Sequence, residues 1–147
     1  MPLSYSTVDT AQDIAHAMVG IVEQYYTDLT RFQGTPILDF YRRVRAIPYC
    51  LEFGIYQNLQ RPGFTLNGHG PFTACANKAI AIASYLKLKN IPYRFKIVSD
   101  EDGEPFHHVF AEGFFNAKWV PMDATYPENS FGQEQNWAST EVIYPCC

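Results

Sequence analysis

A cysteine, a histidine and an aspartate occur in this order within residues 68–125 of the chain. Cys75 opens an apolar run with helical character, His108 lies in a predicted strand, and Asp123 follows the next predicted strand. A cysteine nucleophile needs an imidazole to accept its proton and a carboxylate to orient that imidazole. Each residue alone is commonly structural, but the three together predict a cysteine-dependent enzyme.

The segment after Cys75 is predicted to be a buried helix. Residues 68–71, Gly-His-Gly-Pro, form a turn cluster, and Thr73 is a suitable N-cap residue. The run that follows is apolar on more than one side, which is typical of a helix in the centre of a small domain. Cys75 then lies in the first helical turn, where free N–H groups and the helix dipole favour a thiolate over a thiol.

Three strands with short turns are predicted after this helix, over residues 93–98, 106–115 and 118–122. The Asp102-Gly103 pair is a hairpin signal, and the short connections indicate an antiparallel meander on which the helix packs. Asp123 comes directly after the third strand, so it can reach a histidine on the neighbouring strand.

Two adjacent histidines compete for this role. In a strand, His108 shares a face with Phe110 and Glu112, whereas His107 shares the other face with Val109 and Ala111. Only one of the two can point toward the helix that carries Cys75. Strand alternation alone leaves this choice open.

The chain before residue 68 supplies helices and a polar segment. Apolar residues at helical spacing predict helices over residues 10–29 and 36–47, the first with a capping box at Thr10 and Asp13. The segment 49–67 has no clear periodicity. Gln57 and Asn58 within it are candidate donors to an oxyanion. The alternative is that they belong to a polar loop without a role in catalysis.

Composition limits the class of protein. The chain has 147 residues, 47% of them hydrophobic, which predicts one domain, 1–147, with a packed core. A net charge of −4 argues against a nucleic-acid partner, and the basic residues Arg42, Arg43 and Arg45 are interpreted as a solvated helix face.

No leader sequence or membrane span is recognised, so a cytoplasmic location is expected. The four cysteines show no metal-binding spacing, so no metal is expected.

Four segments of residues 68–125 resemble the core of the transglutaminase-like superfamily of cysteine enzymes, which has a papain-like fold. They are GHGPFTACANKAIAIASYL, NIPYR, HVFAE and WVPMDAT. The register of the HVFAE segment selects His108 over His107. Phe110 replaces the tryptophan that is usual in the family, and Asn77-Lys78 replaces an acidic pair that is common in its bacterial members.

The resemblance implies an α+β fold in which N-terminal helices and a central cysteine-bearing helix pack on an antiparallel meander. It implies that Cys75 is the nucleophile, His108 the general base and acid, and Asp123 the orienting carboxylate. The family attacks an amide carbonyl and forms a thioester, without a cofactor. Tyr56, Phe110 and Trp119 are candidate rings of an aromatic groove that binds a peptide or protein substrate.

The acceptor of the acyl group is left open by these motifs. Water gives a protease or amidase, an amine gives a transglutaminase, and a non-catalytic peptide-binding module is a third alternative. Small bacterial and viral members are more often hydrolases. The loop around residues 54–70 and the chain after Tyr126 are short and polar, so we expect water to reach the acyl-enzyme freely. The oligomeric state is not predicted.

Overall fold

The computed structural model describes residues 10–48, 59–67, 75–103, 105–126 and 129–145. Helices precede strands along the chain. The elements are α1 (Ala11–Tyr25), a 3-10 helix η1 (Tyr26–Phe32), α2 (Ile37–Arg45), α3 (Pro62–Leu66), α4 (Cys75–Leu88), β1 (Tyr93–Ser99), β2 (His108–Phe115), β3 (Lys118–Met122) and β4 (Ser139–Ile143).

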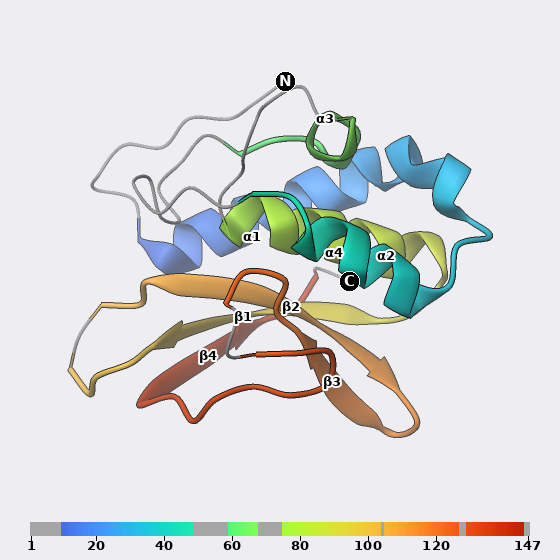
Figure 1. Ribbon diagram of the computed structural model, residues 1–147. Helices are drawn as coiled ribbons and strands as arrows, with labels where there is room; N and C mark the ends of the chain where they lie inside the picture. The colour runs from blue at the N-terminus through green and yellow to red at the C-terminus, as the bar shows by residue number, and fades with distance from the viewer. Residues whose placement is uncertain (1–9, 49–58, 68–74, 104, 127–128, 146–147) are drawn as a thin grey trace.

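The helices form one layer and the sheet forms a second layer beneath them (Figure 1). The four strands lie in the order β3-β2-β1-β4, and every neighbouring pair is antiparallel. The predicted α+β fold is therefore confirmed, including the meander of β1, β2 and β3. The chain after Tyr126 returns to add β4 beside β1.

Helix α4 is the centre of the fold, because it contacts the sheet and the other helices. Every residue from Cys75 to Leu86 is buried. The helix packs along β2, and a Cβ placed on Gly113 would come within 2.8 Å of Met122 Cε and 3.2 Å of Leu86 Cδ1. Glycine at this position therefore permits the close approach of α4 to the sheet.

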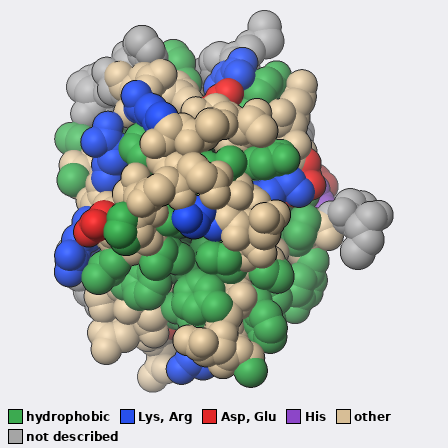
Figure 2. Space-filling view, turned by 90° about the vertical axis from the view of Figure 1, so that its right-hand side faces the viewer, with side chains coloured by type: hydrophobic (Ala, Val, Ile, Leu, Met, Phe, Trp, Pro, Cys, Tyr) green, Lys and Arg blue, Asp and Glu red, His purple; other side chains and the backbone are tan. Residues whose placement is uncertain are grey.

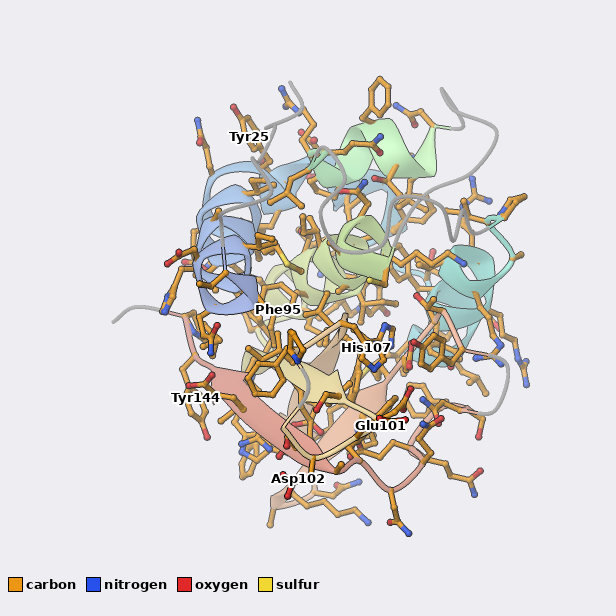
Figure 3. The ribbon with its side chains drawn as sticks, turned by 90° about the vertical axis from the view of Figure 1, so that its left-hand side faces the viewer. Tyr25, Phe95, Glu101, Asp102, His107 and Tyr144 are labelled. Atoms are coloured by element: carbon orange, nitrogen blue, oxygen red, sulfur yellow. The ribbon has the colours of Figure 1, made fainter. Side chains whose placement is uncertain are left out.

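Alternation separates the two faces of the sheet. Phe95, Val109 and Ala111 belong to the apolar core that the helices cover, and Figure 3 shows Phe95 between the sheet and the helices. The other face carries charged residues, among them Arg94 and Glu112, whose side chains approach to 2.6 Å. His108 begins β2 with the parity of this second face.

The structure differs from the sequence prediction in the helical half of the chain. The first helix ends at Tyr25 and continues as the 3-10 helix η1, with a kink at Leu29. The segment that had no clear periodicity contains the short helix α3, which begins with Pro62. No helix in the described ranges is long and apolar enough to cross a membrane.

The capping box at the start of α1 gives a test of the local fold. Thr10 Oγ1 accepts from the backbone N–H of Asp13 at 3.1 Å, and the Asp13 carboxylate accepts from the backbone N–H of Thr10 at 3.5 Å. Thr10→Ala removes one of these acceptors and should lower the free energy of unfolding by about 0.5–2 kcal/mol. Urea denaturation measures the change. Thr10→Ser keeps the acceptor, so a loss of equal size in both variants would contradict this role.

Candidate active site

The early end of β3 creates the candidate site. The last pair between β2 and β3 is Ala111 with Met122, so His108 to Phe110 have no partner on β3. Asp123 follows β3 at this point, and its Oδ2 lies 2.7 Å from His108 Nε2. His108 is 1% exposed and Asp123 is 0% exposed. The two residues therefore form a buried, hydrogen-bonded pair at the open end of the meander.

The Asp123 carboxylate is held by further donors. Its Oδ1 accepts from the backbone N–H groups of Thr125 at 2.9 Å and Tyr126 at 3.5 Å. Its Oδ2 also accepts from the side-chain amide of Asn129 at 2.8 Å. Asn129 is fully buried, and its own Oδ1 accepts from the backbone N–H of Gln135. Both oxygens are therefore fixed, and so is the direction from which the carboxylate meets the imidazole.

The imidazole ring is held by aromatic contacts. Tyr126 stacks on His108 with 4.1 Å between ring centroids, and Phe110 and Trp137 contact the ring at 5.8 and 5.9 Å. Trp137 Nε1 donates to Glu134 at 2.7 Å. These contacts restrict rotation of the His108 ring, so Nε2 stays directed at the carboxylate.

Cys75 is the first residue of α4 and is 1% exposed. The second ring nitrogen of His108, Nδ1, is buried and has no hydrogen-bond partner among the described residues. Interaction with Cys75 raises the pKa of His108. Since Nε2 is bonded to Asp123, Nδ1 is the ring nitrogen that is left without a hydrogen bond.

Burial and the neighbouring charges act in opposite directions on the pair. Burial lowers the pKa of His108, but hydrogen bonding to Asp123 and interaction with Cys75 outweigh it and raise the pKa to about 9. Burial raises the pKa of Asp123, but the hydrogen bond and charge of His108 outweigh it and lower the pKa. At neutral pH the pair is therefore an imidazolium and a carboxylate.

The backbone after β3 is held from the helical layer. The Tyr41 hydroxyl donates to the carbonyl oxygen of Asp123 at 2.6 Å, and Arg45 Nη1 donates to the same oxygen at 3.3 Å. Arg42 and Arg43 are exposed as predicted. The interpretation of Arg45 as part of a solvated face was wrong, because this side chain turns inward toward the carbonyl beside the candidate carboxylate.

The other predicted site residues fall in different places. Gln57, Asn58 and Tyr56 lie outside the described residues. Phe110 is buried beside His108. Trp119 lies at the start of β3, the far end from Asp123.

Trp119 forms a separate aromatic group with Phe114 and Tyr144, and the Arg94 guanidinium lies 4.3 Å from the centre of its ring. Figure 2 views the molecule from the side of the turn between β2 and β3, and apolar side chains gather there among lysine and arginine side chains. The structure thus does not bring Trp119 to the histidine.

His107, the competing histidine, precedes β2 and is exposed, with its side chain 39% accessible. Its Nε2 accepts from the backbone N–H of Asp100 at 3.1 Å, and it lies at the connection between β1 and β2 that Figure 3 shows. Within the described residues, no group of three or more His, Cys, Asp or Glu side chains is arranged to hold a metal ion.

Sequence reasoning missed Asn129 and Tyr126 as part of the site. Trp137 was likewise not assigned to the site. Asn129 lies in an aperiodic polar segment, and no spacing relates it to Asp123 until the fold is known. The tyrosine directly follows the WVPMDAT segment, so its position in sequence was the available signal.

The closed form of the site contradicts the expectation of free water access. Cys75, His108 and Asp123 are each no more than 1% exposed. Tyr126 and Trp137, which contact the imidazole, are themselves half-buried. The three candidate residues are therefore buried, and the His108 ring is packed against the half-buried rings of Tyr126 and Trp137.

Comparisons with known proteins give one informative result. No protein-family model and no curated protein matches the chain. Its fold is similar to the solved structure of a protein from Cytophaga hutchinsonii named "putative cysteine protease", with a TM-score of 0.51 and 14% sequence identity. The similarity covers 95% of this chain and 57% of that protein. At this identity it establishes a cysteine-protease-like fold and not an activity.

The raised pKa of His108 predicts a pH dependence of stability. The ordinary pKa is 6.5 and the folded value is about 9, so the stabilisation from the charged ring is complete below pH 6.5 and is lost as the pH rises through about 9. Urea unfolding of wild type and His108→Gln between pH 6 and 9.5 measures it. The difference in unfolding free energy should fall with pH across this window. Parallel curves would show that the ring is not charged in the folded protein.

Proposed function

We propose that the chain is a cysteine hydrolase of the transglutaminase-like superfamily, in which Cys75, His108 and Asp123 cleave an amide bond through a thioester. One observation carries the proposal. The buried carboxylate occupies one nitrogen of the imidazole and leaves the other for a thiol at the start of a helix. This is the arrangement that nucleophilic catalysis by cysteine requires.

The resting state follows from the charges. With the pKa of His108 raised to about 9, the ring is protonated at neutral pH and holds the proton that the leaving group will need. The start of α4 adds the positive end of the helix dipole and backbone N–H groups that have no partner within the helix. Asp123 keeps the ring in the orientation that presents Nδ1 to the sulfur.

The reaction then proceeds in two stages. The Cys75 sulfur attacks the carbonyl carbon, a C–S bond forms, and negative charge develops on the carbonyl oxygen. His108 Nδ1 gives its proton to the leaving amine nitrogen as the C–N bond breaks. In the second stage His108 takes a proton from water, whose oxygen attacks the thioester, and the C–S bond breaks to release the acid and the thiolate.

The fold supports a protease or amidase as the first candidate, because the structurally similar protein carries the name of a cysteine protease. A peptide or protein is the proposed substrate. Acyl transfer to an amine is a second candidate, and the closed site favours it, since a thioester screened from water survives long enough to meet an amine.

Substitution of the three residues tests the mechanism. Cys75→Ala and His108→Ala should each reduce cleavage to background, and Asp123→Ala should leave more activity because the base remains while its orientation is lost. Cleavage of a peptide library followed by mass spectrometry is the assay. His107→Ala is the matched control and should retain wild-type activity. Full activity in Cys75→Ala would overturn the proposal.

A competition experiment decides whether water or an amine accepts the acyl group. A glutamine-containing peptide is incubated with the protein and a fluorescent primary amine, beside a peptide library in buffer alone. The hydrolase proposal predicts cleavage in excess of amine incorporation over all substrates. If incorporation exceeds cleavage and both vanish in Cys75→Ala, the chain is a transglutaminase instead.

A further inference from the structure

A buried lysine lies one turn after the candidate nucleophile. Lys78 belongs to α4, a helix whose other buried residues are almost all apolar, and it is 2% exposed. Residues three apart share a helix face, so Lys78 lies on the side of α4 that Cys75 occupies. The proposed mechanism gives this side chain no role.

The Lys78 ammonium joins three parts of the fold. Its Nζ donates to the carbonyl oxygen of Ala124 at 3.2 Å and to the carbonyl oxygen of Arg45 at 3.3 Å. Ala124 directly follows the candidate carboxylate Asp123, and Arg45 is the last residue of α2. A single side chain of the cysteine-bearing helix thus holds the turn after β3 and the C-terminal end of α2.

This arrangement is unfavourable as packing alone. Burial lowers the pKa of Lys78, as does the charge of Arg45, to about 8, while the charges of Asp123 and Cys75 act against this lowering. Apolar residues of similar volume often stabilise a core as well as or better than a buried charge does. A methionine would therefore suit the interior of α4, but it would leave the carbonyl of Ala124 without this donor.

We propose that Lys78 is a positioning residue of the candidate site, which fixes the turn after Asp123 on the helix that begins with Cys75. The inference rests on the proposed function of Cys75, His108 and Asp123. Because Cys75 and Lys78 belong to the same buried helix, the hydrogen bond from Nζ to the Ala124 carbonyl also limits the position of the carboxylate relative to the sulfur. The imidazole between them then meets both partners at once.

The size of the effect follows from the geometry of catalysis. A misplacement of about 1 Å among reacting groups reduces a rate on the order of 100-fold. Lys78→Met removes the donors and keeps the length of the side chain. We expect kcat to fall about 10-fold to 100-fold, with KM nearly unchanged, since substrate contacts remain. Lys78→Arg keeps charge and donors and should restore part of the rate.

Two readouts need no substrate and separate this inference from the proposed function. One is the NMR resonance of the His108 Nε2 proton, which reports its hydrogen bond to Asp123. The other is the rate at which iodoacetamide labels Cys75, followed by peptide mass spectrometry. Both should change in Lys78→Met. Both should stay at wild-type values in Lys87→Met, a control on the same helix whose lysine pairs with Glu23 at the surface.

Each outcome of these measurements supports or overturns the positioning role of Lys78. A folded Lys78→Met protein with a wild-type His108 resonance and wild-type Cys75 labelling overturns the inference, whatever the activity. If Lys78→Met does not fold, the ammonium protons of Lys78 in the wild-type protein are the measurement. Slow exchange with solvent below pH 7 supports the two hydrogen bonds, and rapid exchange overturns them. A chain without turnover but with the expected NMR and labelling changes fails the proposed function and keeps the positioning role.

Discussion

The hydrogen bond between His108 Nε2 and Asp123 Oδ2 is the interaction on which the candidate site depends. The two groups that it joins, an imidazolium and a carboxylate, are both almost completely inaccessible to water. Removing two charges from water is costly unless further hydrogen bonds satisfy their remaining atoms. Three more donors meet Asp123, from Asn129 and from the backbone of Thr125 and Tyr126. The local chain is therefore folded around this carboxylate.

The position of the pair follows from unequal strand lengths. β2 runs from His108 to Phe115, whereas β3 ends at Met122, opposite Ala111. Had β3 continued, its residues would have paired with the first residues of β2. The segment that carries Asp123 could then not lie beside His108. Because β3 stops, the chain is free to turn toward the helices. Tyr41 and Arg45 hold its first carbonyl there.

Much of the fold was predictable because it depends on local periodicity. The apolar run after Cys75, the three strands and their turns each carry a signal within a few residues, and α4, β1, β2 and β3 lie where these signals placed them. α3 was not predictable, since five residues beginning at a proline give no period to detect.

The candidate site was predictable only in part. Strand alternation left the choice between the two histidines open, and the structure places His108 on the face of β2 opposite to Val109 and Ala111, which the helices cover. The motif register favoured His108. Alternation did not decide the choice because Asp123 bonds to His108 at the end of β2 that has no partner on β3, and not across a face of the sheet. Asn129, Arg45 and Lys78 reach the site through long-range packing that no spacing in the sequence encodes.

The segment after β3 has two roles that use different atoms. Asn129 and the backbone of Thr125 hold the carboxylate through hydrogen bonds, whereas Tyr126 and Trp137 cover the imidazole through ring contacts. Movement of the Tyr126 and Trp137 rings would end these contacts and the hydrogen bond from Trp137 Nε1 to Glu134, but none of them is a donor to Asp123. The two rings can therefore move away from His108 while Asp123 keeps its donors. A site that is closed at rest can open in this way without losing the geometry on which its chemistry depends.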